Sequence, residues 1–184
     1  MRYEKFLWSA LVFVLVLAGC IPIPIPINLG DPGISKELTL SGESEKIWDF
    51  KDVELDGKKI MEEIKKRGIS GTVTFHDIRL SGKVTVEGNI KLTGAFIGFS
   101  LENPQGKSFE ELPKDWKIDI SGQEGYDFSI SAKDSPALKE ALKKINGKEK
   151  FTLYVVFGYE SCKGSGTLEI EVTNVTVWVT WTAW

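Results

Sequence analysis

The feature that most limits what this chain can fold into is an internal repeat. Residues 48–50 (Trp-Asp-Phe) reappear 78 positions later as residues 126–128 (Tyr-Asp-Phe), and six of the nineteen positions from 48 to 66 are identical in this gapless match. The flanking residues match in the same order, which a chance likeness between two helices does not explain. We therefore expect two copies of one architecture, at about 37–101 and 117–182. The flanking matches include Leu38 with Ile118, Ser41 with Ser121, Val84 with Leu168, Val86 with Ile170 and Glu87 with Glu171.

Each copy is predicted to hold strands, then a helix, then further strands. In the first copy, Asp56 is expected to cap a helix that runs to about Arg67 and ends at Gly68. In the second copy, Ser135 and Pro136 begin the helix, and Asn146 and Gly147 end it. A change of inward parity along the first copy predicts a bulge near His76 and Asp77. The predicted strands are 38–41, 47–55, 73–80, 84–92, 95–101, 126–131, 151–159 and 167–181, with a loop at 102–116 and a turn at 160–166.

Short alternating runs separated by Gly and Ser favour an antiparallel sheet with one packed face. Two helices of about eleven residues are too short to cover a large sheet, so the sheet is expected to cover itself. The predicted fold class is mainly β (α+β): an antiparallel β-sandwich or strongly curved sheet with two short amphipathic helices, built from a tandem duplication about an approximate twofold.

The first nineteen residues have the composition of a secretory signal. Arg2 and Lys5 precede an uncharged apolar run from residue 6 to 17, which is shorter than the roughly 20 residues that a spanning helix prefers. The run ends in Leu17-Ala18-Gly19-Cys20, which resembles the lipobox of bacterial lipoproteins. That resemblance implies cleavage before Cys20, acylation of its sulfur and display of the chain on the cell envelope, facing the periplasm or the exterior. The alternatives are a signal anchor or a buried helix.

The expected domain division follows from this end of the chain. Residues 1–19 are the signal, 20–36 a lipidated cysteine with a proline-rich tether, and 37–184 a single β-rich domain. Proline at every second position from Pro22 to Pro26 predicts an extended, stiff segment. Isoleucines alternate with these prolines, so an edge strand packed on the domain is the alternative.

Charge and cysteine content exclude several classes of protein. Removing Arg2, Lys5 and Glu4 with the signal leaves 21 basic and 25 acidic side chains, a net charge near −4, which offers no footprint for nucleic acid. Once Cys20 is acylated only Cys162 remains, so neither an internal disulfide nor a multi-cysteine zinc site is possible. Cys162 is interpreted as a turn residue. We expect no cofactor and no metal.

No catalytic motif stands out. The only histidine, His76, lies inside a predicted strand, and neither a nucleophile elbow nor a phosphate-binding loop is present. Asp49 and Asp127 occupy equivalent places in the two copies, so a glycosidase-like carboxylate pair is the one enzyme hypothesis. Duplication explains that equivalence better, and both are interpreted as turn or cross-strand residues.

Aromatic residues are the remaining functional signal, because exposed Trp and Tyr stack on sugars or anchor protein partners. Candidate contact residues are Trp116, Trp178, Trp181 and Trp184, whereas the equivalent residues Trp48 and Tyr126 are expected in the core. The sequence thus favours a non-catalytic domain that binds an envelope protein or a glycan. The alternative is a carrier of lipid or another hydrophobic ligand, which requires an apolar channel along Val84, Val86, Leu168 and Ile170.

Overall fold

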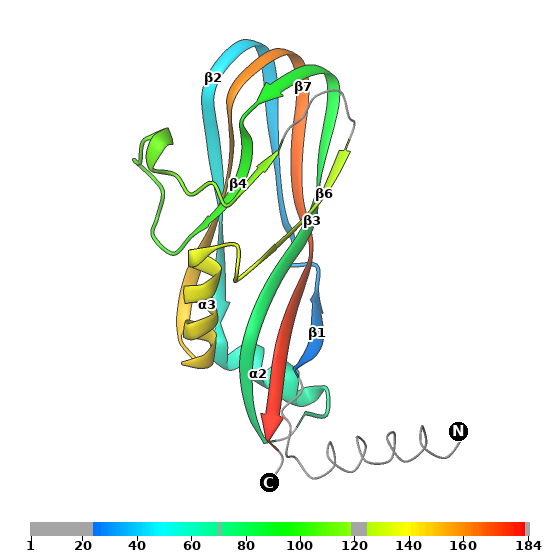
Figure 1. The fold of residues 1–184 in the computed structure, drawn as a ribbon, viewed down its shortest axis with the longest axis vertical. Coiled ribbons are helices and arrows are strands. Elements are labelled where there is room, and N and C mark those ends of the chain that lie inside the picture. Colours follow the sequence, from blue (N-terminus) through cyan, green and yellow to red (C-terminus); the bar gives the residue numbers. More distant parts are fainter. Residues whose placement is uncertain (1–23, 70, 119–124, 183–184) are drawn as a thin grey trace, which may run out of the picture.

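The computed structural model describes residues 24–69, 71–118 and 125–182, which form an antiparallel sheet folded over on itself and two short α-helices (Figure 1). This confirms the mainly β class, with a strongly curved antiparallel sheet. The helices are α2 (Gly57–Lys66) and α3 (Pro136–Asn146), and η1 (Phe109–Glu111) is a 3-10 turn. The strands are β1 (Ile25–Gly30), β2 (Ile34–Asp56), β3 (Thr72–Thr93), β4 (Ala95–Ser100), β5 (Trp116–Ile118), β6 (Gly125–Ser131) and β7 (Lys150–Thr182).

Strand β7 is the centre of the sheet. Along one edge it pairs with β3 and then with β4, which continues the same register from Thr72 opposite Thr182 to Ser100 opposite Tyr154. Along the other edge it pairs with the whole of β2 and, nearer its end, with β1. Strand β6 adds to β3, and β5 adds to β4. Every other strand of the described chain is therefore attached to β7 directly or through one neighbour.

The three long strands bend over together at one end of the molecule (Figure 1). Glycines face one another across the ladders there, with Gly42 opposite Gly164 and Gly88 opposite Gly166. Gly42, Gly88 and Gly164 have φ of 75°, 96° and 105°, a region that side chains disfavour. Because all three strands bend in register, their hydrogen bonding continues through the bend.

That continuity corrects several predicted boundaries. The turn expected at 160–166 does not end a strand, since β7 runs without interruption from residue 150 to 182. Strands expected at 38–41 and 47–55 are both parts of β2, and those at 73–80 and 84–92 are both parts of β3. Cys162 is accordingly no turn residue: it lies within β7, opposite Ser44 and Leu92, and is buried.

Two bulges offset one another in the β3–β7 ladder. One register shift lies between Phe75 and Asp77, which leaves His76 as the additional residue in β3, as the parity change predicted. The second lies between Ser81 and Gly82, where Thr173 is the additional residue in β7. The first bulge shifts the pairing by one residue and the second restores it, so both ends of the ladder share one register.

The ladder also carries the expected approximate twofold. By sequence, Val84 is equivalent to Leu168 and Val86 to Ile170; in the structure Val84 pairs with Ile170, and Val86 pairs with Leu168. Such reciprocal pairing is what a twofold axis between two copies produces. The axis passes between Thr85 and Glu169, which are equivalent residues and lie opposite each other. Each copy also holds a strand, a helix and a long strand in the same order.

The segment before β2 lies on the sheet. Ile25 pairs with Val179 and Ile27 with Val177, and Ile27 is buried. For Ile25–Gly30 the structure therefore has the edge strand and not the free tether, while residues 20–23 lie outside the described part. The domain begins at least as early as β1, ahead of the expected boundary at residue 37.

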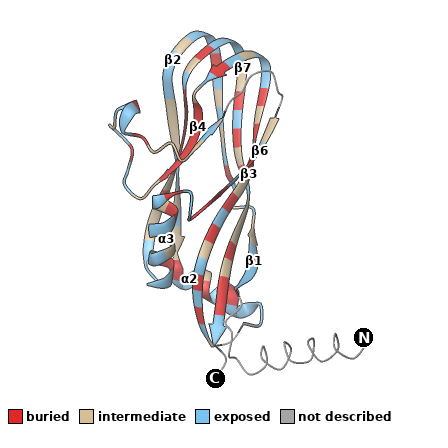
Figure 2. Cartoon of the chain, viewed as in Figure 1, coloured by how far each residue is buried: buried red, intermediate tan, exposed pale blue. Residues whose placement is uncertain are grey.

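The main core lies between the two halves of the folded sheet. Buried and less buried residues alternate along much of β3, and inward residues from both halves of β7, such as Val155 and Ile170, belong to one cluster (Figure 2). The helices close it with fully buried Ile64, Leu138 and Ile145. Their starts follow the sequence signals: the Asp56 carboxylate accepts hydrogen bonds from the amides of Lys58 and Lys59, and the Ser135 hydroxyl accepts one from that of Leu138.

The bend provides a matched pair of glycine substitutions. A Cβ on Gly164 would lie 1.9 Å from the Asn89 carbonyl oxygen, whereas one on Gly42, directly opposite, meets nothing within 4 Å. Both residues have positive φ, so Gly42→Ala should cost about 1–2 kcal/mol from backbone strain alone. Gly164→Ala should lower the free energy of unfolding by about 3 kcal/mol or more. Urea denaturation measures both, and equal losses would show that this close approach does not limit the bend.

Candidate functional site

The single histidine has a structural partner. Nε2 of His76 lies 2.6 Å from the hydroxyl of Thr180 across the bulge. The neighbouring carboxylate of Asp77 accepts hydrogen bonds from the amides of Ile78 and Ala132. Both side chains thus hold the bulge and the start of the α3 connection in place, and the described residues contain no serine–histidine–carboxylate arrangement.

The two equivalent carboxylates also have separate structural settings. Asp49 forms an ion pair of 2.6 Å with Lys36, which joins the two halves of the folded strand β2. Lys36 lies opposite the buried residue Ile170, so it points inward at a sheet edge, a common protection against edge pairing. Asp127 is exposed on β6, directly across from Lys83. The hypothesis of a catalytic pair gains no support from these positions.

The candidate tryptophans do not form one surface. Trp116 begins β5 and packs half-buried on Phe128, with 5.2 Å between ring centroids. Trp178 is half-buried under the guanidinium of Arg79, which lies 4.7 Å from its ring centroid. Trp181 is 39% exposed and lies an odd number of residues from Trp178, so the two project from opposite faces of β7. Trp184, like Cys20, lies outside the described residues.

A row of aromatic side chains that was not expected from the sequence lies on the outer face of the sheet. It is on the half formed by the second part of β2 and the first part of β7. Trp48 and Phe50 project from alternate positions of β2, with 6.2 Å between ring centroids, and Tyr154 of β7 lies 5.9 Å from Phe50. All three are half-buried, so Trp48 is no core residue, and neither is its equivalent Tyr126. We call Trp48, Phe50 and Tyr154 the aromatic row. Their alternation was visible in the sequence, but the covered and uncovered faces were not.

The segment 101–115, close to the loop expected at 102–116, packs beside this row. It inserts Phe109 and Leu112 into a second buried cluster with Phe96 and Val156. A Cβ on Gly98 would lie 2.0 Å from the carbonyl oxygen of Pro113, so only glycine lets the loop approach β4 this closely. Further contacts hold it: an ion pair of 2.6 Å between Lys46 and Glu110, and the Lys114 ammonium 4.1 Å from the ring centroid of Phe109.

Asp115 ends this loop in a partly desolvated position. Its carboxylate accepts a hydrogen bond of 3.3 Å from the amide of Phe99. Burial raises the pKa of this carboxyl above its usual value, and the hydrogen bonds from the Ser135 hydroxyl and the Phe99 amide only partly oppose that effect. Since Ser135 also caps α3, Asp115 connects the loop, β4 and the helix start.

Cys162 is 2% exposed, and burial raises the pKa of its thiol. A buried thiol with a raised pKa is a poor nucleophile. The nearby phenol of Tyr159 is fully buried and lies 2.9 Å from the Ser44 hydroxyl. These groups close the inside of the bend.

The clefts of the described surface are open and have mixed polar and apolar linings. One of about 670 Å³ lies between β3 and β6 and is lined by Lys83, Glu87, Tyr126 and Asp127 among others. Residues 24–69, 71–118 and 125–182 contain no cluster of His, Cys, Asp and Glu suited to a metal ion. No helix among those same residues is long and apolar enough to cross a membrane.

Comparisons with known proteins give no family. No protein-family model matches the chain, and no curated protein matches it. Among solved structures, a chain of the Kashmir bee virus particle is 11% identical, with a TM-score of 0.39 over 89% of this chain and 95% of that one. The decameric BFDV capsid protein is 5% identical, with a TM-score of 0.38 over 88% and 100%. At these values the similarity carries no argument about function.

Asp115 and Asp134 should respond to pH with opposite signs. The pKa of Asp115 is raised, so the native state holds its proton more tightly, and stability falls as pH rises from 3.8 through the folded pKa. The Ser131 amide and hydroxyl lower the pKa of Asp134, so its contribution is present above 3.8 and is lost as pH falls through the folded pKa. Urea denaturation should therefore show that, as pH rises from 3 to 7, Asp115→Asn becomes more stable relative to wild type and Asp134→Asn becomes less stable relative to wild type. A pH-independent difference for Asp115→Asn would contradict the assignment.

Proposed function

We propose that the chain is a lipoprotein anchored to a membrane through Cys20, and that its extracytoplasmic domain binds another envelope protein without catalysis. The observation that carries the proposal is the aromatic row: three half-buried rings held beside one another on the outside of an otherwise filled domain. Rigid aromatic side chains lose little entropy on binding and are frequent anchors of protein interfaces.

The packing of the interior favours this proposal over the carrier. A channel for an acyl chain requires apolar side chains along its wall that a water-sized molecule reaches. Val84, Leu168 and Ile170 are 0%, 0% and 1% exposed, and Val86 is 8% exposed, all within one cluster. Close packing at these four positions is the state that a surface-binding domain requires.

The placement of the tryptophans favours a protein partner over a glycan. Sugar binding by stacking requires exposed rings that share a plane along one surface. Trp178 is covered by Arg79 and lies on the opposite face of β7 from Trp181. The aromatic row is instead bordered by apolar residues and by charged groups such as Asp52 and Lys46, an arrangement of anchors and polar rim that suits a protein interface.

The proposal is tested with the tagged full-length chain expressed in its native host, with membranes solubilised and bound proteins quantified by mass spectrometry. Wild type should take up an acyl label and fractionate with membranes, and Cys20→Ser should do neither. The amount of partner captured by Trp48→Gln should be at least about tenfold lower than with wild type, since central aromatic anchors contribute about 2 kcal/mol or more to the binding free energy. Tyr126→Gln, at the equivalent half-buried position of the second copy, should retain it.

Each part of the proposal has its own contradicting result. Acyl label on Cys20→Ser, or a membrane fraction unchanged by that substitution, would reject the anchor. Retained partner with Trp48→Gln, or loss with Tyr126→Gln alone, would reject the aromatic row as the interface.

A further inference from the structure

The end of the molecule opposite the bend gathers several elements that are distant in sequence. Helix α2, the first residues of β1 and β3 and the last residues of β7 meet there (Figure 1). Val73 of β3 pairs with Trp181, and Lys65 of α2 and Lys148 after α3 line one cleft with Val73. Arg67 donates a hydrogen bond of 2.6 Å to the carbonyl oxygen of Asn28 in β1. We call this the basal end.

The basal end is basic although the chain is acidic. Segment 56–67, which holds α2, and segment 147–150, which follows α3, together contain seven basic and four acidic side chains, a net charge of +3 in a chain of net charge −3. Lys58, Lys59, Lys65 and Lys148 are exposed and form no ion pair within the described residues. Their ammonium groups are therefore available to an anionic partner.

The opposite sign dominates the outer face near the twofold axis. Glu37 and Glu169 lie opposite each other there, and Glu87 lines the same shallow cleft. The basal end and this part of the outer face therefore differ in the sign of their charge. Such a separation orients a protein in the field of a charged surface.

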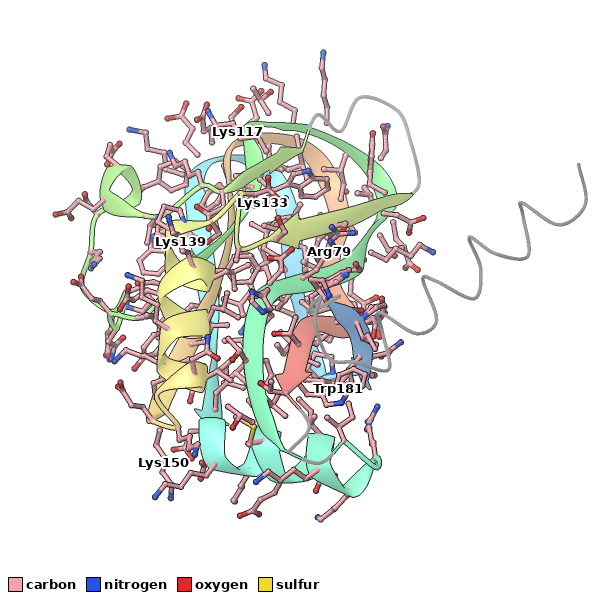
Figure 3. The ribbon with its side chains drawn as sticks, turned by 60° about the horizontal axis from the view of Figure 1, so that its bottom comes forward. Arg79, Lys117, Lys133, Lys139, Lys150 and Trp181 are labelled. Carbon is pink, nitrogen blue, oxygen red and sulfur yellow. The ribbon has the colours of Figure 1, made fainter. Side chains whose placement is uncertain are left out.

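Apolar side chains project from the same basal end. Three large hydrophobic residues among those described are exposed, and two of them are here: Ile25 at 37% and Trp181 at 39%. Figure 3, with this end brought forward, labels Trp181 and Lys150 near it. Lysines and an exposed tryptophan at one end of a domain match the membrane–water interface, where indole rings sit among headgroups and lysines reach their phosphates.

The start of the described chain identifies the partner. This inference rests on the lipid that we propose on Cys20. The four residue steps from Cys20 to Pro24 span at most about 14 Å. Strand β1 begins at Ile25, next to Val179 near the end of β7, so the anchor holds the basal end against the membrane. We infer that the basal end docks on an anionic lipid surface, with Lys58, Lys59 and Lys65 binding headgroup phosphates and Trp181 entering the interface.

The test uses the mature chain, residues 20–184, made without lipid and with Cys20→Ser, so that acylation plays no part. Residues from Ile27 to Val179 supply the whole described main core, so this chain keeps what folds the domain. It should float with phosphatidylcholine–phosphatidylglycerol vesicles (7:3) at 50 mM NaCl, should not float with phosphatidylcholine alone, and should be released by 0.5 M NaCl.

Matched lysine variants locate the contact. Lys58→Gln with Lys59→Gln and Lys65→Gln should weaken binding by about tenfold or more, since each lysine near an anionic surface contributes several-fold. The control variant combines Lys91→Gln, Lys117→Gln and Lys163→Gln, which removes the same charge away from the basal end; Lys91 and Lys163 lie opposite each other near the bend. This variant should keep binding within about twofold of wild type. Brominated lipids should quench the wild-type tryptophan fluorescence, and Trp181→Phe should lose most of that quenching.

Three results would overturn the inference: no flotation with anionic vesicles, equal loss in both lysine variants, or quenching unchanged in Trp181→Phe. Urea denaturation of each variant confirms that it is folded. Because this chain carries no acyl group, a negative result rejects basal docking alone, whereas rejection of the anchor comes only from the labelling of Cys20→Ser.

Discussion

Strand β7 hydrogen-bonds to neighbours along both of its edges through a bend, and the rest of the structure depends on that one arrangement. An ordinary side chain at Gly164 would collide with the carbonyl of Asn89 on the neighbouring strand. With glycine there, β2, β3 and β7 bend in register, and the inward residues of one half of each strand meet those of the other. The sheet thus supplies its own second layer, and two short helices suffice to close it.

Local chemistry made part of this predictable. Asp56 and Ser135 fixed the helix starts because a cap needs only neighbouring amides. The bulge at His76 followed from a change of alternation within one strand, and the fold class followed from alternation and the repeat. Continuity through Gly42 and Gly164 was not predictable, because a glycine that ends a strand and one that bends it look alike unless the neighbouring strands are known.

The candidate site was less accessible to sequence reasoning for a similar reason. Which face of a strand stays uncovered depends on what packs there from elsewhere. Phe109 and Leu112 lie in a segment with the composition of a loop, yet they bury the outer face of β4 beside Gly98, and the face next to them remains as the aromatic row. The tail tryptophans looked like a surface in sequence, but Trp178 is covered by Arg79.

The filled interior limits where function resides. With the residues between helices and sheet closely packed and the single histidine bonded to Thr180, the chemically distinctive features lie outside: the aromatic row on one half of the sheet and the basal end with its lysines. Together with the lipid that we propose on Cys20, these two surfaces make up our proposal of a domain that stands on a membrane by one end and presents aromatic anchors on its side.

The most direct test of the filled interior is a pair of mass spectra, native and denaturing, of the unlipidated domain purified under native conditions. We predict the same bare protein mass in both, unchanged after incubation with lipids. A bound acyl species that is present in the native spectrum and lost on denaturation would contradict it, because the core has no room for such a chain.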